Sequence, residues 1–127
     1  MKNSEDIKIT KTRRDKKLNG KTFKKQTPVG NAYITINCNG NKKNDPFEIF
    51  IKVGKPGSEV YAVGEAIGRL ISLILRIPSK ANRQIKLSWV IEELCEIDGG
   101  RSIGAGKEQV RSLPDGIAQV LVEYLDS

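Results

Sequence analysis

The stretch AYITINCNGNKKNDPFEIFIKV, residues 32–53, decides the fold. Every second residue is apolar from 32 to 37 and again from 47 to 53, which is the pattern of strands with one buried face. The intervening run, residues 39–46, is rich in Asn, Gly, Asp and Pro, which favour turns. We therefore predict an antiparallel hairpin that places Ile34 and Ile36 on one face of its first strand and Tyr33 and Thr35 on the other.

Three helical patterns follow this hairpin. The first begins after Ser58, a good N-cap, and runs to about Arg76, with apolar residues at positions 60, 63, 67, 70, 71 and 74. The second has its core face at positions 87, 91, 94 and 95 and is closed by Gly99 and Gly100. The third begins at Ser112 and repeats apolar residues at positions 117, 120, 121, 124 and 125.

Together these elements predict an α+β domain in which three helices pack on a small antiparallel sheet. A sheet of two strands is marginal by itself. Either the segment from Thr22 to Lys25 adds a third strand, or a second copy of the protein covers the exposed edge, and we expect a homo-oligomer on this ground. Residues 21–127 then form one domain, preceded by an arm of residues 1–20.

The positive charge of the chain lies in this arm. Residues 1–26 hold ten Lys or Arg side chains against three Asp or Glu, which accounts for the whole net charge of +7. With so few apolar residues the arm cannot offset the entropy of ordering, so we expect residues 1–20 to be mobile unless bound. Two interpretations stay open: an arm attracted to the phosphates of nucleic acid or of a small ligand, and a solvated tail.

The residues that most chemistry needs are missing or scattered. The chain has no histidine, which is the commonest general base near neutral pH and the commonest metal ligand. Cys38 and Cys95 lie 57 positions apart, outside any C-x-x-C spacing, and we expect both to be buried, with Trp89 as a packing anchor. The sequence therefore predicts no enzyme, no metal and no cofactor. It also lacks a signal peptide and an apolar stretch near the roughly 20 residues of a membrane span, so we expect a cytoplasmic protein.

The glycine-rich segment from Gly99 to Lys107 is a first candidate site. Its backbone amides, with Arg101 and Lys107, could hold an anion. A phosphate-binding Walker loop would need Gly at the position of Arg101 and Ser or Thr at that of Glu108, so the motif is not met. A connecting loop is the alternative interpretation.

The segment Arg111-Ser-Leu-Pro-Asp115 is a second candidate. Ser112 can cap the third helix and Asp115 can answer it as in a capping box, which is a complete structural explanation. A functional interpretation is also open, because a helix N-terminus beside Arg111 attracts anions and Asp115 could accept hydrogen bonds from a ribose or a base edge. Arg69, four residues after Glu65 on the first helix, would matter if that face met a ligand.

These elements, in this order, resemble the TSCPD domain, which occurs at the C-terminal end of adenosylcobalamin-dependent ribonucleotide reductases and as a free-standing protein. The likeness covers the hairpin, the turn at 54–58, the helix segment 65–72 and the segment 112–118. The family is named for Thr-Ser-Cys-Pro-Asp, of which this chain keeps only Ser112, Pro114 and Asp115. The resemblance implies the fold and an association with nucleotides. It implies no thiol role, because Leu113 replaces the cysteine, and no reductase activity, because the catalytic barrel is absent.

The chain is also similar, more loosely, to phage anti-defence proteins that sequester the cyclic ADP-ribose signals of the Thoeris system. We therefore expect a non-catalytic module that binds or sequesters a small phosphate-bearing ligand such as a cyclic nucleotide signal. Its predicted binding residues are Arg69, Arg101, Lys107, Arg111, Ser112 and Asp115. The alternatives are an accessory factor that binds nucleic acid or protein through the basic arm, and a regulatory partner of a ribonucleotide reductase.

Overall fold

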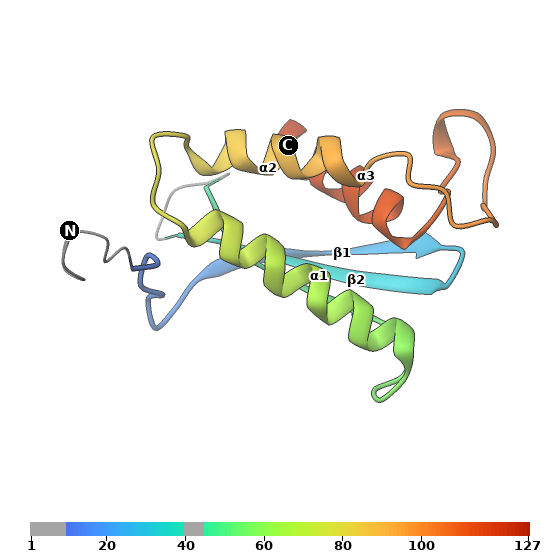
Figure 1. Cartoon of the computed structure of the whole chain (residues 1–127), viewed down its shortest axis with the longest axis horizontal. Coiled ribbons are helices and arrows are strands. Elements are labelled where there is room, and N and C mark those ends of the chain that lie inside the picture. The colour runs from blue at the N-terminus through green and yellow to red at the C-terminus, as the bar shows by residue number, and fades with distance from the viewer. Residues whose placement is uncertain (1–9, 40–44) are drawn as a thin grey trace, which may run out of the picture.

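Three strands come first in the chain and three helices follow (Figure 1). The computed structural model describes residues 10–39 and 45–127. Its strands are β1 (Asn19–Thr27), β2 (Gly30–Cys38) and β3 (Pro46–Val53), and its helices are α1 (Glu59–Arg76), α2 (Arg83–Leu94) and α3 (Leu113–Asp126), with a short 3-10 turn, η1 (Gly106–Glu108). The predicted α+β class and the predicted hairpin of β2 and β3 are confirmed. Most of the predicted turn at 39–46 lies outside the described residues.

The sheet is antiparallel in the order β1-β2-β3. β1 pairs with β2 along its whole length, from Asn19 opposite Cys38 to Thr27 opposite Gly30. The third strand therefore exists and is longer than the segment from Thr22 to Lys25 that the sequence indicated. Because this chain completes its own sheet, an edge left open by a two-stranded sheet no longer argues for a second copy, and the homo-oligomer stays a prediction.

One face of the sheet carries the core. The side chains of β2 and β3 that face the helices are nearly fully buried, and they include Ala32, Ile34, Ile36, Phe47, Ile49, Ile51 and Val53. The helices contribute Ile71 and Leu75 from α1, Leu87 from α2, and Ile117, Leu121 and Tyr124 from α3. Figure 1 shows α1 crossing in front of the strands, with α2 and α3 above it. The opposite face of the sheet carries no helix in the described part of the chain.

α1 approaches the backbone of β3 through two glycines. Gly64 and Gly68 are buried, and a Cβ atom on Gly68 would lie 3.1 Å from the carbonyl oxygen of Ile49 and 3.3 Å from the amide nitrogen of Ile51. One turn later the Ser72 hydroxyl accepts a hydrogen bond from the Ile49 amide (2.8 Å) and donates one to the Ile49 carbonyl (3.1 Å). The helix thus satisfies and covers backbone groups of the edge strand.

This approach explains an error in the predicted core face of α1. Three of its expected core positions are exposed, namely Val63 (43%), Leu70 (60%) and Ile74 (39%). The buried line instead follows Gly64, Gly68, Ile71 and Leu75. Counting apolar residues could not detect this line, because its two closest contacts are glycines.

Three expectations for α2 were also wrong. α2 begins after its cap Asn82 and ends at Leu94, so Cys95 lies beyond the packed turns and is exposed, whereas Cys38 is half-buried. Trp89 is 52% exposed and does not anchor the core, because Leu87 and Val90 make the buried contacts of this helix. Gly99 and Gly100 do not close α2 but belong to the loop that follows it.

The structure describes only part of the basic arm. Residues 1–9 of the predicted arm lie outside the described residues, and β1 begins at Asn19. The expected mobility of residues 1–20 stays a prediction. In the described part of the chain, no helix has the length and apolarity needed to span a bilayer.

We expect Gly68→Ala to lower the free energy of unfolding by about 1–2 kcal/mol, measured by urea denaturation, because the added methyl group presses on backbone atoms of a paired strand. The control is Ala66→Gly, on the exposed side of the same helix, where the lower helix propensity of glycine should cost about 1 kcal/mol. Glycine should thus be preferred at 68 and alanine at 66. A Gly68→Ala protein at least as stable as the wild type would contradict the close approach.

Candidate ligand-binding site

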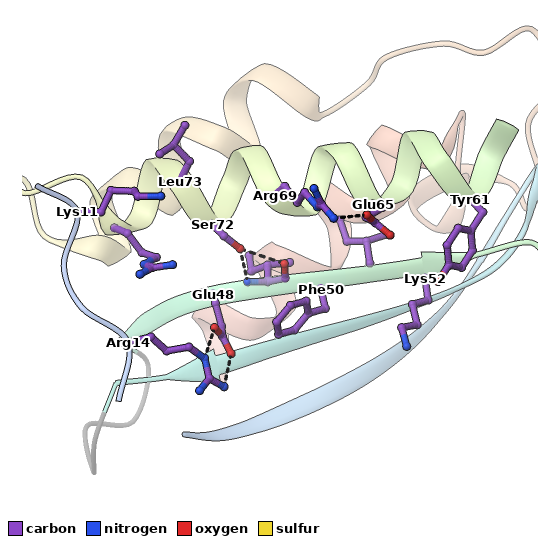
Figure 2. A pocket seen from close by; sticks show the side chains of 13 residues that line it. Lys11, Arg14, Glu48, Phe50, Lys52, Tyr61, Glu65, Arg69, Ser72 and Leu73 are labelled. Carbon is purple, nitrogen blue, oxygen red and sulfur yellow. Dashed lines mark hydrogen bonds and ion pairs between the residues drawn. The ribbon is translucent and has the colours of Figure 1, made fainter. Parts of the chain in front are cut away.

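A cleft of about 490 Å³ lies between α1, the outer edge of β3 and the segment that precedes β1 (Figure 2). This volume falls within the roughly 300–1,000 Å³ of small-molecule sites. Lys11 and Arg14 lie at one end of the cleft and Tyr61 at the other, with Arg69 on α1 between them. The edge of β3, from Ile49 to Ile51, lines the side opposite α1.

The lining is strongly positive. It contains two carboxylates, Glu48 and Glu65, against five cationic side chains, which are Lys11, Arg14, Lys52, Arg69 and Arg76. Arg69 Nη2 lies 2.7 Å from Glu65 Oε2, and the two side chains are 79% and 48% exposed. Such an exposed pair on a helix is worth only about 0.5 kcal/mol, so Arg69 can exchange this partner for an anion at little cost.

Glu48 fixes the N-terminal segment to the cleft. Its carboxylate accepts hydrogen bonds from Arg14 Nε (2.8 Å) and Nη2 (3.1 Å) and from Asn37 Nδ2 (2.6 Å), and its side chain is only 6% exposed. Burial alone would raise the pKa of Glu48, but the bonds from Arg14 and Asn37 and the charges of Arg14 and Arg76 outweigh burial and hold this pKa below its usual value. The pair is therefore ionised near neutral pH.

Arg76 ties the same segment to the end of α1. Its Nε donates to the carbonyl of Thr12 (3.1 Å), and the Thr12 amide donates to the carbonyl of Arg76 (2.9 Å). The guanidinium also lies 5.3 Å from the centre of the Phe47 ring, within cation–π range. Together with Arg14, these contacts hold Lys11 beside the cleft.

The start of α3, the second site predicted from sequence, is occupied by its own hydrogen bonds. Ser112 caps the helix by accepting from the Asp115 amide (3.1 Å), and its hydroxyl donates to the Ile97 carbonyl. The Asp115 carboxylate accepts from the amides of Glu96 (2.8 Å) and Arg111 (2.9 Å). The hydrogen bond that Asp115 was expected to make to the cap residue is thus made to Arg111, the residue before the cap. With the bond from Glu96, it fixes both ends of the loop between α2 and α3.

This segment holds what the chain keeps of a known signature. The family model for the TSCPD domain matches residues 7–125. The chain belongs to the TSCPD domain family. No curated protein and no solved structure matches it.

In this TSCPD domain the signature serves the fold. Leu113, at the position of the signature cysteine, is 5% exposed and packs in the core. Ser112 and Asp115 are buried as well. The Arg111 side chain is half-buried and lies 3.6 Å from Glu96.

The six predicted binding residues do not converge. Arg69 lines the cleft, and the other five do not. Arg101 and Lys107 are exposed in the loop before α3, which projects at the end of the molecule away from the N-terminal segment (Figure 1). In the parts of the chain that are described, no group of three or more His, Cys, Asp or Glu side chains could hold a metal ion.

Sequence reasoning missed most of the cleft. Its parts come from the arm, β3 and α1, and only the tertiary structure brings them together. The spacing of Glu65 and Arg69 did single out one residue that lines the cleft, and a binding role for Arg69 stays a prediction.

Glu48→Gln should lower the free energy of unfolding at pH 7 by about 2 kcal/mol, because it removes a buried charge that accepts charge-assisted hydrogen bonds. The folded pKa of Glu48 is depressed, so its stabilisation is complete above the unfolded value of about 4.3 and is lost as pH falls through the lower folded value. The difference in free energy of unfolding between wild type and variant, measured by urea denaturation, should therefore become smaller below about pH 4. Glu65→Gln, at an exposed pair, should change stability by no more than about 0.5 kcal/mol. Equal effects of the two variants would contradict the assigned role of Glu48.

Asp115→Ala should destabilise the protein by about 2–4 kcal/mol, because it leaves the Glu96 and Arg111 amides without their acceptor. Thermal and urea unfolding measure this loss. The matched control is Glu123→Ala, an exposed acidic residue of the same helix, whose effect should stay within about 0.5 kcal/mol. If Asp115→Ala were as stable as this control, the carboxylate would be available for a ligand.

Proposed function

We propose that this TSCPD domain is a non-catalytic module that binds a small phosphate-bearing ligand in the cleft between α1 and β3. The observation that carries the proposal is the excess of cations in the cleft, five against two carboxylates. Two of these cations, Lys11 and Arg14, come from the basic arm, and the other three come from the body of the chain, whose charges otherwise balance. A concave, positively lined surface focuses its potential on anions.

The cations of the cleft differ in what they can offer. Arg69 presents a planar guanidinium that can hold two phosphate oxygens at once. Lys11 and Lys52 contribute compact, rotatable charges from opposite sides of the cleft. Arg14 and Arg76 are held by Glu48 and Thr12, so they set the field and the shape of the site.

The aromatic side chains favour a nucleotide over a bare phosphate. Tyr61 is half-buried at one end of the cleft, and Phe50 is 50% exposed at its rim. An aromatic ring gives a base a surface on which to stack, while the cations hold its phosphates. A cyclic nucleotide signal such as a cyclic ADP-ribose combines these two groups, and its sequestration is the specific form of the proposal that we favour.

We further propose that the ligand is left intact. The lining has no histidine, because the chain has none. Ser72, the serine of the cleft, has its hydroxyl engaged with both backbone groups of Ile49. Each carboxylate of the lining is paired with an arginine.

Isothermal titration calorimetry against linear and cyclic nucleotides, including a cyclic ADP-ribose, tests the proposal. At least one phosphate-bearing member should bind, and Arg69→Ala should weaken that binding about ten-fold or more, as expected when a charged hydrogen-bonding partner is lost. The matched control is Arg101→Ala, in the loop before α3, which should bind as the wild type does. The ligand should also be recovered unchanged, by mass spectrometry, after the protein is denatured.

Two results would overturn the assignment. Absence of heat with every nucleotide would remove the proposed function. A loss of binding in Arg101→Ala or Lys107→Ala, with Arg69→Ala unaffected, would move the site to the loop before α3.

A further inference from the structure

The face of the sheet that carries no helix differs in its residue types from an ordinary solvent-exposed face. Along β2 it presents Tyr33 and Thr35, and along β3 it presents Phe50 and Lys52. Tyr33 is 46% exposed and Phe50 is 50% exposed. Scattered apolar residues on a surface need no explanation, but two large aromatic rings on one open sheet face do.

The strand register makes these two rings neighbours. Thr35 lies opposite Phe50 and Tyr33 lies opposite Lys52, so Tyr33 and Phe50 are diagonal neighbours on adjacent strands. Side chains in this relation are within reach of each other. The hydroxyls of Thr35 and Thr22, 2.7 Å apart, continue the Phe50 row towards β1. Tyr33, Thr35 and Phe50 therefore share one patch of the open face, which we call the platform.

The platform is flanked by positive charge. Tyr33 has Lys24 of β1 on one side and Lys52 of β3 on the other. Among the strand residues on this face the acidic one is Glu48, and its charge is neutralised by Arg14. That ion pair also holds Arg14, from the segment before β1, at the end of the sheet where Glu48 lies.

We propose that this open face binds single-stranded nucleic acid. Unpaired bases would stack on Tyr33 and Phe50, and the phosphates between them would lie against Lys24, Lys52 and the cations of the arm. A duplex keeps its bases stacked within the helix and cannot use the rings. A second copy of the chain fits the face less well, because a symmetric interface would bring lysines that flank an aromatic ring against one another. The proposal does not depend on the ligand proposed for the cleft.

Fluorescence anisotropy with labelled oligo-uridine RNA, oligo-thymidine DNA and a mixed-sequence duplex tests this idea on the full chain. Both single strands should bind, and the duplex should bind more weakly at equal salt. Tyr33→Ala should weaken single-strand binding about ten-fold, while Tyr33→Phe should retain it because the ring remains. Lys24→Gln should reduce the slope of log K against log salt by about 0.7, the loss of one phosphate contact to a single strand.

Arg69→Ala separates this site from the cleft. It should leave oligonucleotide binding unchanged, whereas Tyr33→Ala should leave nucleotide binding in the cleft unchanged. Because Tyr33 is half exposed, its variants should fold, and circular dichroism checks this. Equal binding of duplex and single strands, or equal affinities of Tyr33→Ala and wild type, would overturn the proposal. A third result would also overturn it: no oligonucleotide binds, and sedimentation shows a dimer that Tyr33→Ala disrupts. The face would then be an interface between copies.

Discussion

The contact between α1 and the backbone of β3 determines how the rest of the molecule can be used. Gly64 and Gly68 let the helix axis approach an edge strand closely, and Ser72 satisfies the backbone groups that the edge would otherwise expose. An edge strand invites pairing with other chains, so covering it in this way removes a liability of a small sheet. The same approach turns the charged flank of α1, with Glu65 and Arg69, over the outer edge of β3 and so creates the cleft.

A second constraint comes from Glu48, which connects β3 with β2 and with the segment before β1. Its carboxylate bonds to Asn37 on the neighbouring strand and to Arg14 in the segment before β1. Breaking a buried ion pair at one partner leaves an uncompensated charge, which makes such a pair a firm point of attachment. The part of the arm at residues 12–14 is therefore anchored at two places, to Glu48 and to the end of α1. Lys11 and Arg14, which composition alone assigns to a tail, thus line the cleft.

The sequence predicted what depends on local signals. Alternation located the hairpin, and Ser58 and Ser112 cap α1 and α3 as predicted. The third strand was one of two alternatives that the sequence left open for completing a two-stranded sheet, and the structure contains it. Sequence reasoning failed where a contact depends on small residues or on distant segments. Glycines mark the buried line of α1, and Trp89 lies half-exposed in a groove between α1 and α2 instead of in the core.

The candidate site shows the same limit more sharply. The signature segment was predicted to be functional because Ser and Asp are residue types that often bind ligands. The same residue types also cap helix ends. In the structure both oxygens of the Asp115 carboxylate accept hydrogen bonds from backbone amides. Arg69, which the sequence singled out, does line the cleft, but only the fold shows what surrounds it. A capping motif is therefore stronger evidence for a helix start than for a ligand, unless some of its polar atoms remain unused.

The two proposed sites share one edge of the sheet, and this arrangement has a consequence of its own. Lys52 and Phe50 line the cleft and also belong to the open face. A ligand that draws Lys52 into the cleft takes a cation from the platform, and an oligonucleotide that engages Lys52 takes one from the cleft. Coupling between sites is reciprocal, so each ligand would weaken the other by the same factor. Negative coupling of this kind would arise from one shared side chain without any change in the fold, because the strands that carry both sites are held by the core beneath them.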